Sequence, residues 1–312
     1  MTNQPFLQEV ENDSGLNNLK STQDWLKENK IFIELKLEEH GAIIFKDLPV
    51  KTAEDFDQFV STFNYETFTY EESLSNAVRI NKTDKVFTAN EAPREVEIFL
   101  HHEMAQTPTY PKNIFFFCKS ASETGGETPL CRSDQLYEAL LKADKALVES
   151  FEKFGVIYNS IMSSGDELIS GQGRSWQKTL GVSSKNDAEA KLSKLGYSWN
   201  WIEDDNLSVT TKTLQATKEL GNGQKSFFNQ VIAASLGWKK NSENQIAPVR
   251  FGNGEEIKES YIELISELAQ SLTLLRSWQD HDILLIDNYR VMHGRKPFAG
   301  NKNREVLVSL TN

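Results

Sequence analysis

Two short segments that lie far apart in the sequence each place a histidine beside other groups that suit a metal site. One contains His101, His102 and Glu103, and the other contains His293, which a glycine and Arg295 follow. Successive side chains alternate between the two faces of a strand, so a strand here puts His101 and Glu103 on one face and His102 on the other. A site completed by His293 requires the two segments to meet in space, which restricts the fold strongly.

Two imidazoles and one carboxylate on one face of an iron ion leave adjacent coordination positions open for an oxidisable co-substrate and for dioxygen. A closed zinc site needs four protein ligands, and the two cysteines, Cys118 and Cys131, do not form a CxxC-type pair. We expect both thiols to be reduced and structural. The residues alone leave two alternatives open, which are a zinc hydrolase that uses the same three side chains and an ordinary strand with polar surface residues.

Three motifs together resemble the taurine dioxygenase and clavaminate synthase superfamily of iron- and 2-oxoglutarate-dependent oxygenases. They are Leu100–Met104 (LHHEM), Thr124–Leu130 (TGGETPL) and Asp287–Phe298 (DNYRVMHGRKPF). The similarity runs from Thr88 to the C-terminus, and the N-terminal part is less distinctive. The resemblance implies that His101, Glu103 and His293 bind Fe(II).

The same resemblance implies a binding site for the co-substrate. In this superfamily an arginine that follows the second histidine by eleven residues pairs with the far carboxylate of 2-oxoglutarate, and a threonine of the glycine-rich motif assists; here these are Arg304 and Thr128. A guanidinium fork can bind a carboxylate through two parallel hydrogen bonds, which a lysine cannot do. The implied reaction uses O2, converts 2-oxoglutarate to succinate and CO2, and hydroxylates an unactivated carbon of the substrate.

Several positions bear on the substrate and the outcome. Glu103 fills a coordination place that related halogenases leave to chloride, so the resemblance favours hydroxylation, with desaturation or cyclisation as alternatives. A glutamate at this place is similar to the amino-acid-modifying branch, and Val308 stands where taurine dioxygenase carries its sulfonate-binding arginine. We therefore expect a small-molecule substrate, an amino acid or a derivative, that is free or bound to a carrier protein. Candidate polar residues for its pocket are Arg174, Gln177, Asn229 and Arg290.

The fold that the resemblance implies is mainly β, with a double-stranded β-helix, or jelly roll, and helices packed outside it. Apolar patterns predict strands over residues 41–45, 98–104, 113–119, 197–202, 207–211, 283–286 and 305–310. Helical spacing predicts helices over residues 17–29, 52–63, 133–144, 145–154, 186–195 and 257–275. We expect one domain over residues 1–312, with residues 131–220 as an approximate insertion and lid region and residues 165–173 as its mobile loop.

Charge and the remaining histidines narrow the functional classes. The formal net charge of -11 argues against nucleic acid and anionic membranes as partners, because both need clustered Lys and Arg. No signal-peptide pattern and no apolar run of spanning length is present, so we expect a cytoplasmic location. His40 and His281 stand among polar residues, and we expect both to face solvent. The competing class is a jelly-roll protein that binds ligands without redox chemistry.

Overall fold

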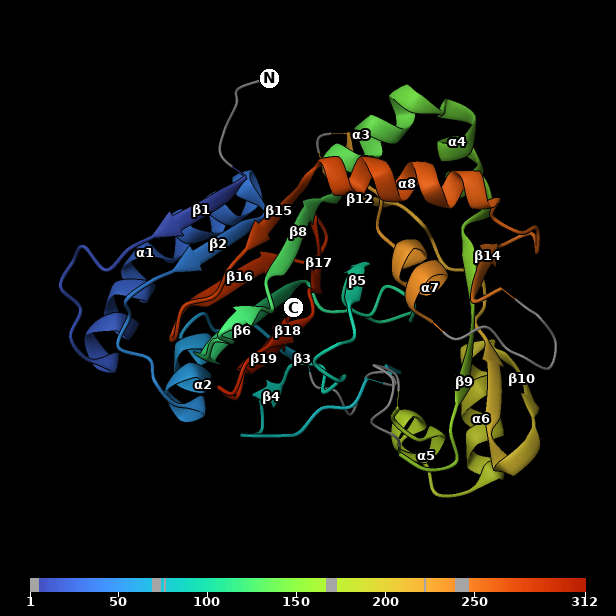
Figure 1. The fold of residues 1–312 in the computed structure, drawn as a ribbon, viewed down its shortest axis with the longest axis horizontal. Coiled ribbons are helices and arrows are strands. Elements are labelled where there is room, and N and C mark those ends of the chain that lie inside the picture. Colours follow the sequence, from blue (N-terminus) through green and yellow to red (C-terminus); the bar gives the residue numbers. More distant parts are fainter. Residues whose placement is uncertain (1–5, 69–73, 76, 167–172, 222, 239–246) are drawn as a thin grey trace.

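The structure is a computed structural model, and it describes the whole chain except residues 1–5, 69–73, 76, 167–172, 222 and 239–246 (Figure 1). The expected mobile loop at residues 165–173 thus falls largely outside the described residues. Two β-sheets form the centre of the molecule, and helices lie on their outer sides (Figure 1).

The larger sheet has seven strands in the order β1-β2-β16-β6-β19-β3, and β4 also pairs with β19. β1 and β2 run parallel, and the other neighbours in this sheet are antiparallel. The bounds are β1 Leu7–Val10, β2 Ala42–Phe45, β3 Thr67–Phe68, β4 Phe87–Thr88, β6 Asn113–Ser120, β16 Ile283–Asp287 and β19 Glu305–Thr311.

The smaller sheet is antiparallel and has the order β15-β8-β17-β5. Its bounds are β5 Ile98–His101, β8 Thr128–Arg132, β15 Thr273–Arg276 and β17 Val291–Arg295. A short pair, β7 (Thr124–Gly125) with β18 (Phe298–Ala299), lies beside it. Phe116 and Leu284 of the larger sheet share one buried cluster with Leu130 and Val291 of the smaller sheet. The two sheets therefore face each other across an apolar core, which is the predicted jelly roll.

The outer face of the larger sheet is covered by α1 (Leu19–His40) and α2 (Ala53–Ser61). The sequence of β2 is apolar throughout because both faces of this strand are buried. Ile44 points into the core between the sheets, whereas Ile43 and Phe45 pack against the helices. A strand that is buried on both faces has no polar alternation.

The outer face of the smaller sheet is covered by other helices, whose side chains pack on Cys131 and Met292. These are α3 (Ser133–Ala143), α4 (Lys145–Phe154), α7 (Val231–Gly237) and α8 (Glu259–Ser271). Both cysteines are buried and free, as expected. Among the described helices, none has the length and apolar character needed to cross a bilayer.

A long excursion follows α4 and carries a further four-stranded sheet of order β10-β11-β9-β14. Its elements are β9 Val156–Met162, α5 Trp176–Leu180, α6 Lys185–Leu195, β10 Ser198–Trp201, a 3-10 turn at Glu203–Asp205, β11 Leu207–Thr210, the hairpin β12 Lys218–Gly221 with β13 Gln224–Ser226, and β14 Val249–Phe251. It lies to one side of the jelly roll (Figure 1). The division of residues 1–312 into one domain with an insertion at residues 131–220 stays a prediction.

Three sequence expectations need correction. The first helix does not end near residue 29 but continues to His40, because Ile33 and Leu37 extend its buried face and Gly41, at φ 80°, ends it. His40 is consequently buried at 2% exposure instead of solvent-facing, and His281 is half-buried. The helix expected over residues 257–275 ends at Ser271, and the chain then forms β15 against β8.

Candidate active site

The three predicted metal-binding side chains come together at one end of the smaller sheet. His101 ends β5, and His293 lies directly opposite it on the neighbouring strand β17. Glu103 stands in the turn after β5, so the predicted strand over residues 98–104 ends earlier than expected. One ligand atom from each of the three residues lies within 4.8 Å of the others. The fold thus joins the two distant segments, as the sequence requires.

A close approach of backbones allows this juxtaposition. A Cβ atom on Gly294 would lie 2.3 Å from the carbonyl oxygen of Ile98 in the facing strand. The pairing of β17 with β5 also shifts register between His293 and Arg295. Only glycine lets β17 pass this close to β5, so the His-Gly-Arg motif is explained by packing as well as by chemistry.

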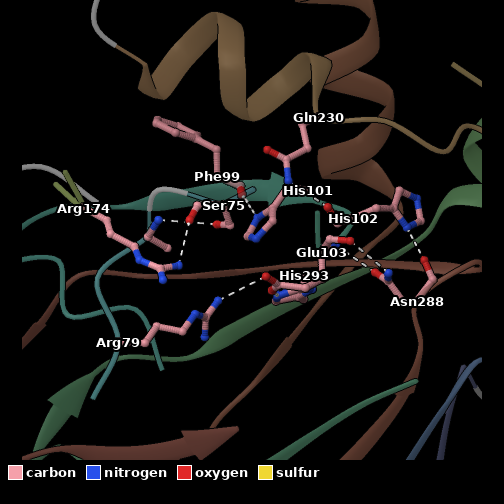
Figure 2. Close-up of polar contacts among 11 residues, drawn as sticks. Ser75, Arg79, Phe99, His101, His102, Glu103, Arg174, Gln230, Asn288 and His293 are labelled. Carbon is pink, nitrogen blue, oxygen red and sulfur yellow. Dashed lines mark hydrogen bonds and ion pairs between the residues drawn. The ribbon is translucent and has the colours of Figure 1, made fainter. Parts of the chain in front are cut away.

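Each histidine is oriented by a hydrogen bond. The Nδ1 of His101 lies 2.8 Å from the carbonyl oxygen of Phe99, which makes Nδ1–H the donor and leaves Nε2 for a metal. The His102 ring points the other way, to the carbonyl of Asn288 and the ring of Phe228 (Figure 2). The Nε2 of His293 lies 3.5 Å from Oε2 of Glu103. The side chains therefore alternate as a strand through His101 predicts.

Asn288 holds the backbone of Glu103 in place. Its Oδ1 accepts a hydrogen bond from the Glu103 N–H at 2.8 Å, and its Nδ2 donates to the carbonyls of Glu103 at 3.1 Å and Pro111 at 2.8 Å. The Asn288 side chain is fully buried. It stands inside the third motif, but nothing in the sequence indicated this role.

We expect Asn288→Leu to lower the free energy of unfolding by about 1–3 kcal/mol, because buried backbone groups of Glu103 and Pro111 lose their partners. It should also weaken metal binding, since the turn that presents Glu103 loses both its contacts to this amide. Urea unfolding and Mn(II) titration measure the two effects. Asn200→Leu, at an exposed position of β10, is the control. Unchanged stability and metal affinity in Asn288→Leu would refute the role.

The charges of the triad suit a divalent metal. Burial lowers the pKa of His101 to about 4, so this ring is neutral at physiological pH. Burial alone would raise the pKa of Glu103, but the Arg79 guanidinium and the hydrogen bond with His293 outweigh it and hold the pKa below its usual range. Neutral imidazoles and a carboxylate are the forms that bind metal. The side chains of the triad, two imidazoles and one carboxylate, match a non-haem Fe(II) site.

A cavity of about 370 Å³ opens from the triad. Thr128 and Arg304 line it together with His101, Glu103 and His293. The five residues expected to hold Fe(II) and 2-oxoglutarate thus line one cavity of the size that small-molecule sites have.

Arg304 precedes β19 and contacts Gly126 and Phe298. Its Nη2 donates to the Gly126 carbonyl at 3.2 Å, and its guanidinium carbon lies 5.3 Å from the centroid of the Phe298 ring. Gly126 has a φ of +74°, and a Cβ on it would meet Arg304 Nε at 2.9 Å, so the second glycine of the motif makes room for this side chain. Burial lowers the pKa of Arg304 from its ordinary value.

Thr128 begins β8, and its hydroxyl oxygen accepts a hydrogen bond from Trp278 Nε1 at 2.9 Å. This contact leaves the Thr128 hydroxyl proton to donate elsewhere, and the residue lines the cavity. Trp278 lies between β15 and β16, and no pattern in the sequence indicated it.

We expect Trp278→Phe to keep the packing but to weaken 2-oxoglutarate binding by roughly 2- to 10-fold, because a neutral hydrogen bond is worth about 0.5–1.5 kcal/mol. Anaerobic titration of the Fe(II) protein with 2-oxoglutarate measures the change. Trp201→Phe is the matched control. Trp201, on β10, also donates a hydrogen bond from Nε1, at 2.7 Å to Glu189 of α6, and it does not line the cavity. Equal affinities in the two variants would exclude the positioning role of Trp278.

Three of the four predicted substrate residues do not line the cavity. Gln177 lines a separate surface depression beside Lys178, and the Asn229 amide bonds the backbone of Ala216 and Val231. Arg290 pairs with Asp287 and Glu38 near the end of α1. None of these three lines the cavity.

The fourth predicted residue, Arg174, and the unpredicted Gln230 lie at or beside the cavity. Arg174 does not line the cavity itself, but its Nη1 donates to the carbonyl of Ser75 at 3.5 Å, and Ser75 does line it. Gln230, the residue after Asn229, lines the cavity and donates to the His102 carbonyl at 2.9 Å. Gln230, which the sequence analysis did not single out, thus lines the cavity, whereas its predicted neighbour Asn229 does not.

Known proteins have sequences similar to this chain. A family model described as taurine catabolism dioxygenase TauD, TfdA family matches residues 7–310. A clavaminate synthase-like protein of Arabidopsis thaliana is 32% identical over 286 residues, which cover 91% of this chain and 86% of that protein. The dapdiamide synthesis protein DdaC of Enterobacter agglomerans is 28% identical over 289 residues, 88% of this chain and 83% of that protein.

A solved structure shares the fold. AAD-2 in complex with Mn(II) and N-oxalylglycine has a TM-score of 0.52 and 15% sequence identity, and the match covers 91% of this chain and 87% of that chain. At this identity the likeness concerns the fold, and it agrees with the two facing sheets described above.

Proposed function

On the premise that the chain belongs to the taurine catabolism dioxygenase TauD, TfdA family, we propose that it hydroxylates an unactivated carbon of an amino acid or an amino-acid derivative. The chain is an Fe(II)- and 2-oxoglutarate-dependent oxygenase, as this family membership indicates. The observation that carries the proposal is the shared cavity, in which the His-Glu-His cluster meets Thr128 and Arg304.

In this proposal His101, Glu103 and His293 hold Fe(II), and Arg304 and Thr128 hold the far carboxylate of 2-oxoglutarate. When bound, the iron with 2-oxoglutarate supplies the activation of dioxygen and the removal of hydrogen from the substrate. The buried protein residues fix these groups before the reaction begins, and this preorganisation avoids reorientation during the reactive steps.

The substrate class rests on three supports. Glu103, a glutamate at the carboxylate position, resembles the amino-acid-modifying branch, and Val308 is a buried apolar residue of β19. Taurine is therefore disfavoured, because no arginine stands at position 308. A relative named for dapdiamide synthesis points to a nitrogen-containing metabolite. The substrate is a small molecule, free or carried as a thioester on a carrier protein.

We also propose that the protein works in the cytoplasm. Its two cysteines are buried and free, and reduced thiols are the rule in that compartment. The net charge of -11 disfavours nucleic acid as a partner.

The test is turnover under ¹⁸O2 with pools of amino acids, followed by mass spectrometry. We expect one labelled oxygen in the product and one in succinate, both dependent on Fe(II) and 2-oxoglutarate. Loss of two hydrogens without label in the product would replace hydroxylation by desaturation or cyclisation. Zinc-dependent hydrolysis at a rate that 2-oxoglutarate does not change would favour a zinc hydrolase. Ligand binding without turnover would favour a jelly-roll binding protein without redox chemistry.

A further inference from the structure

Arg79 was not indicated by the sequence, yet it reaches the centre of the site. It lies on the segment before β4, its side chain is 9% exposed, and its Nη2 lies 3.1 Å from Oε1 of Glu103. It also lines the cavity. Figure 2 shows Arg79 extending toward Glu103 on the side of the triad away from Asn288.

The other arginines that line the cavity have evident tasks. The Arg295 guanidinium donates to the backbone carbonyls of Asn90, Ala92, Pro93 and Val96. Arg304 is the co-substrate residue of the proposed function. The position of Arg79 differs, because the carboxylate that it contacts is the one that binds the metal in that function.

Metal binding changes the electrostatics of Arg79. A divalent cation at the triad takes up the negative charge of Glu103 and places a like charge near the guanidinium. The Arg79 guanidinium lines the cavity beside the triad. A substrate carboxylate bound there can accept charge-assisted hydrogen bonds from it.

A second guanidinium lies on the same side of the cavity. Arg174 donates to the carbonyl of Ser75, and Ser75 and Arg79 both line the space beside the triad. The rest of the lining includes the apolar side chains of Phe99, Ile161 and Trp238. The site therefore has a cationic side next to the metal position and apolar surface beyond it.

Resting on the proposed function, we infer that Arg79 binds an acidic group of the substrate, a carboxylate, once metal occupies the triad. Arg79 contacts Glu103 through Nη2, and part of its guanidinium fork donates to the substrate carboxylate. The oxidised carbon then lies close to the carboxylate. The substrate is a free acid, since a simple acyl thioester has no carboxylate at that end.

The test uses propionate and propionamide, which differ in charge but little in shape. The wild-type protein is saturated anaerobically with Fe(II) and 2-oxoglutarate, and each probe is titrated while the visible charge-transfer band is recorded. We expect propionate, and not propionamide, to shift the band. Arg79→Gln, saturated in the same way, should bind propionate at least roughly 10-fold more weakly, because it loses a charged hydrogen-bond donor. Arg79→Lys should recover part of the effect.

The possible outcomes separate a failure of the Arg79 inference from a failure of the proposed function. Equal effects of the two probes on wild type, or wild-type propionate affinity in Arg79→Gln, would overturn the role of Arg79; the second result would mean that propionate binds iron directly. A wild type that forms no band at all contradicts the proposed function instead, and the Arg79 inference falls with it. Arg94→Gln, at an exposed arginine, is the matched control and should behave as wild type.

Discussion

His293→Ala should lose iron-dependent turnover completely and bind Fe(II) or Mn(II) at least roughly 100-fold more weakly, because altering even an outer partner of a metal ligand costs 10- to 100-fold. His293 contributes one of three ligand atoms that lie within 4.8 Å of one another. Its loss leaves His101 and Glu103, which cannot complete a facial site. Metal affinity is measured by Mn(II) titration with electron paramagnetic resonance, and turnover by succinate formation.

The control for this variant is another histidine remote from the triad. His281 has a φ of 76°, and asparagine tolerates that backbone conformation, so His281→Asn removes an imidazole without strain. Its ring stacks on Phe117 with centroids 6.3 Å apart. We expect normal metal binding in His281→Asn, and full activity in His293→Ala would disprove the ligand assignment.

Arg304→Ala should weaken 2-oxoglutarate binding by roughly 10- to 100-fold, because hydrogen bonds to charged groups contribute about 1.5–3 kcal/mol. The affinity for Fe(II) should change little, since Arg304 contacts Gly126 and Phe298 but no triad residue in the structure. Anaerobic titration with 2-oxoglutarate, at saturating Fe(II), separates the two affinities.

Two further variants sharpen that result. Arg304→Lys keeps the charge but loses the fork, so we expect an affinity between those of wild type and Arg304→Ala. Arg94→Ala removes an exposed arginine near the same loop, where it donates to Gly300, and should leave the affinity unchanged. A 2-oxoglutarate affinity in Arg304→Ala equal to that of wild type would show that another residue holds the co-substrate.

The sequence predicted the parts of this site that depend on local pattern. The alternation of a strand separated His102 from His101. The resemblance to the superfamily assigned Thr128 and Arg304 to one site, and both line the same cavity. Local pattern was also misleading at the end of α1, where polar neighbours suggested an exposed His40 although helix packing buries it.

The residues that the sequence did not reveal act through long-range contacts. Arg79 contacts the Glu103 carboxylate, and Asn288, between β16 and β17, accepts a hydrogen bond from the Glu103 N–H. Neither contact produces a periodic pattern in the sequence. Asn229 was named as a candidate pocket residue, but the residue after it, Gln230, lines the cavity in the turn before α7. Which of two adjacent polar side chains faces a cavity depends on backbone geometry that composition does not encode.

The central claim is that the triad, Thr128 and Arg304 together bind Fe(II) and 2-oxoglutarate. Its most direct test is anaerobic addition of Fe(II) and 2-oxoglutarate, separately and together, to the metal-free protein. The account predicts a weak visible charge-transfer band that appears only with both and that is absent in His293→Ala. Bound iron that gives no band with saturating 2-oxoglutarate, or the same band in His293→Ala, would contradict it.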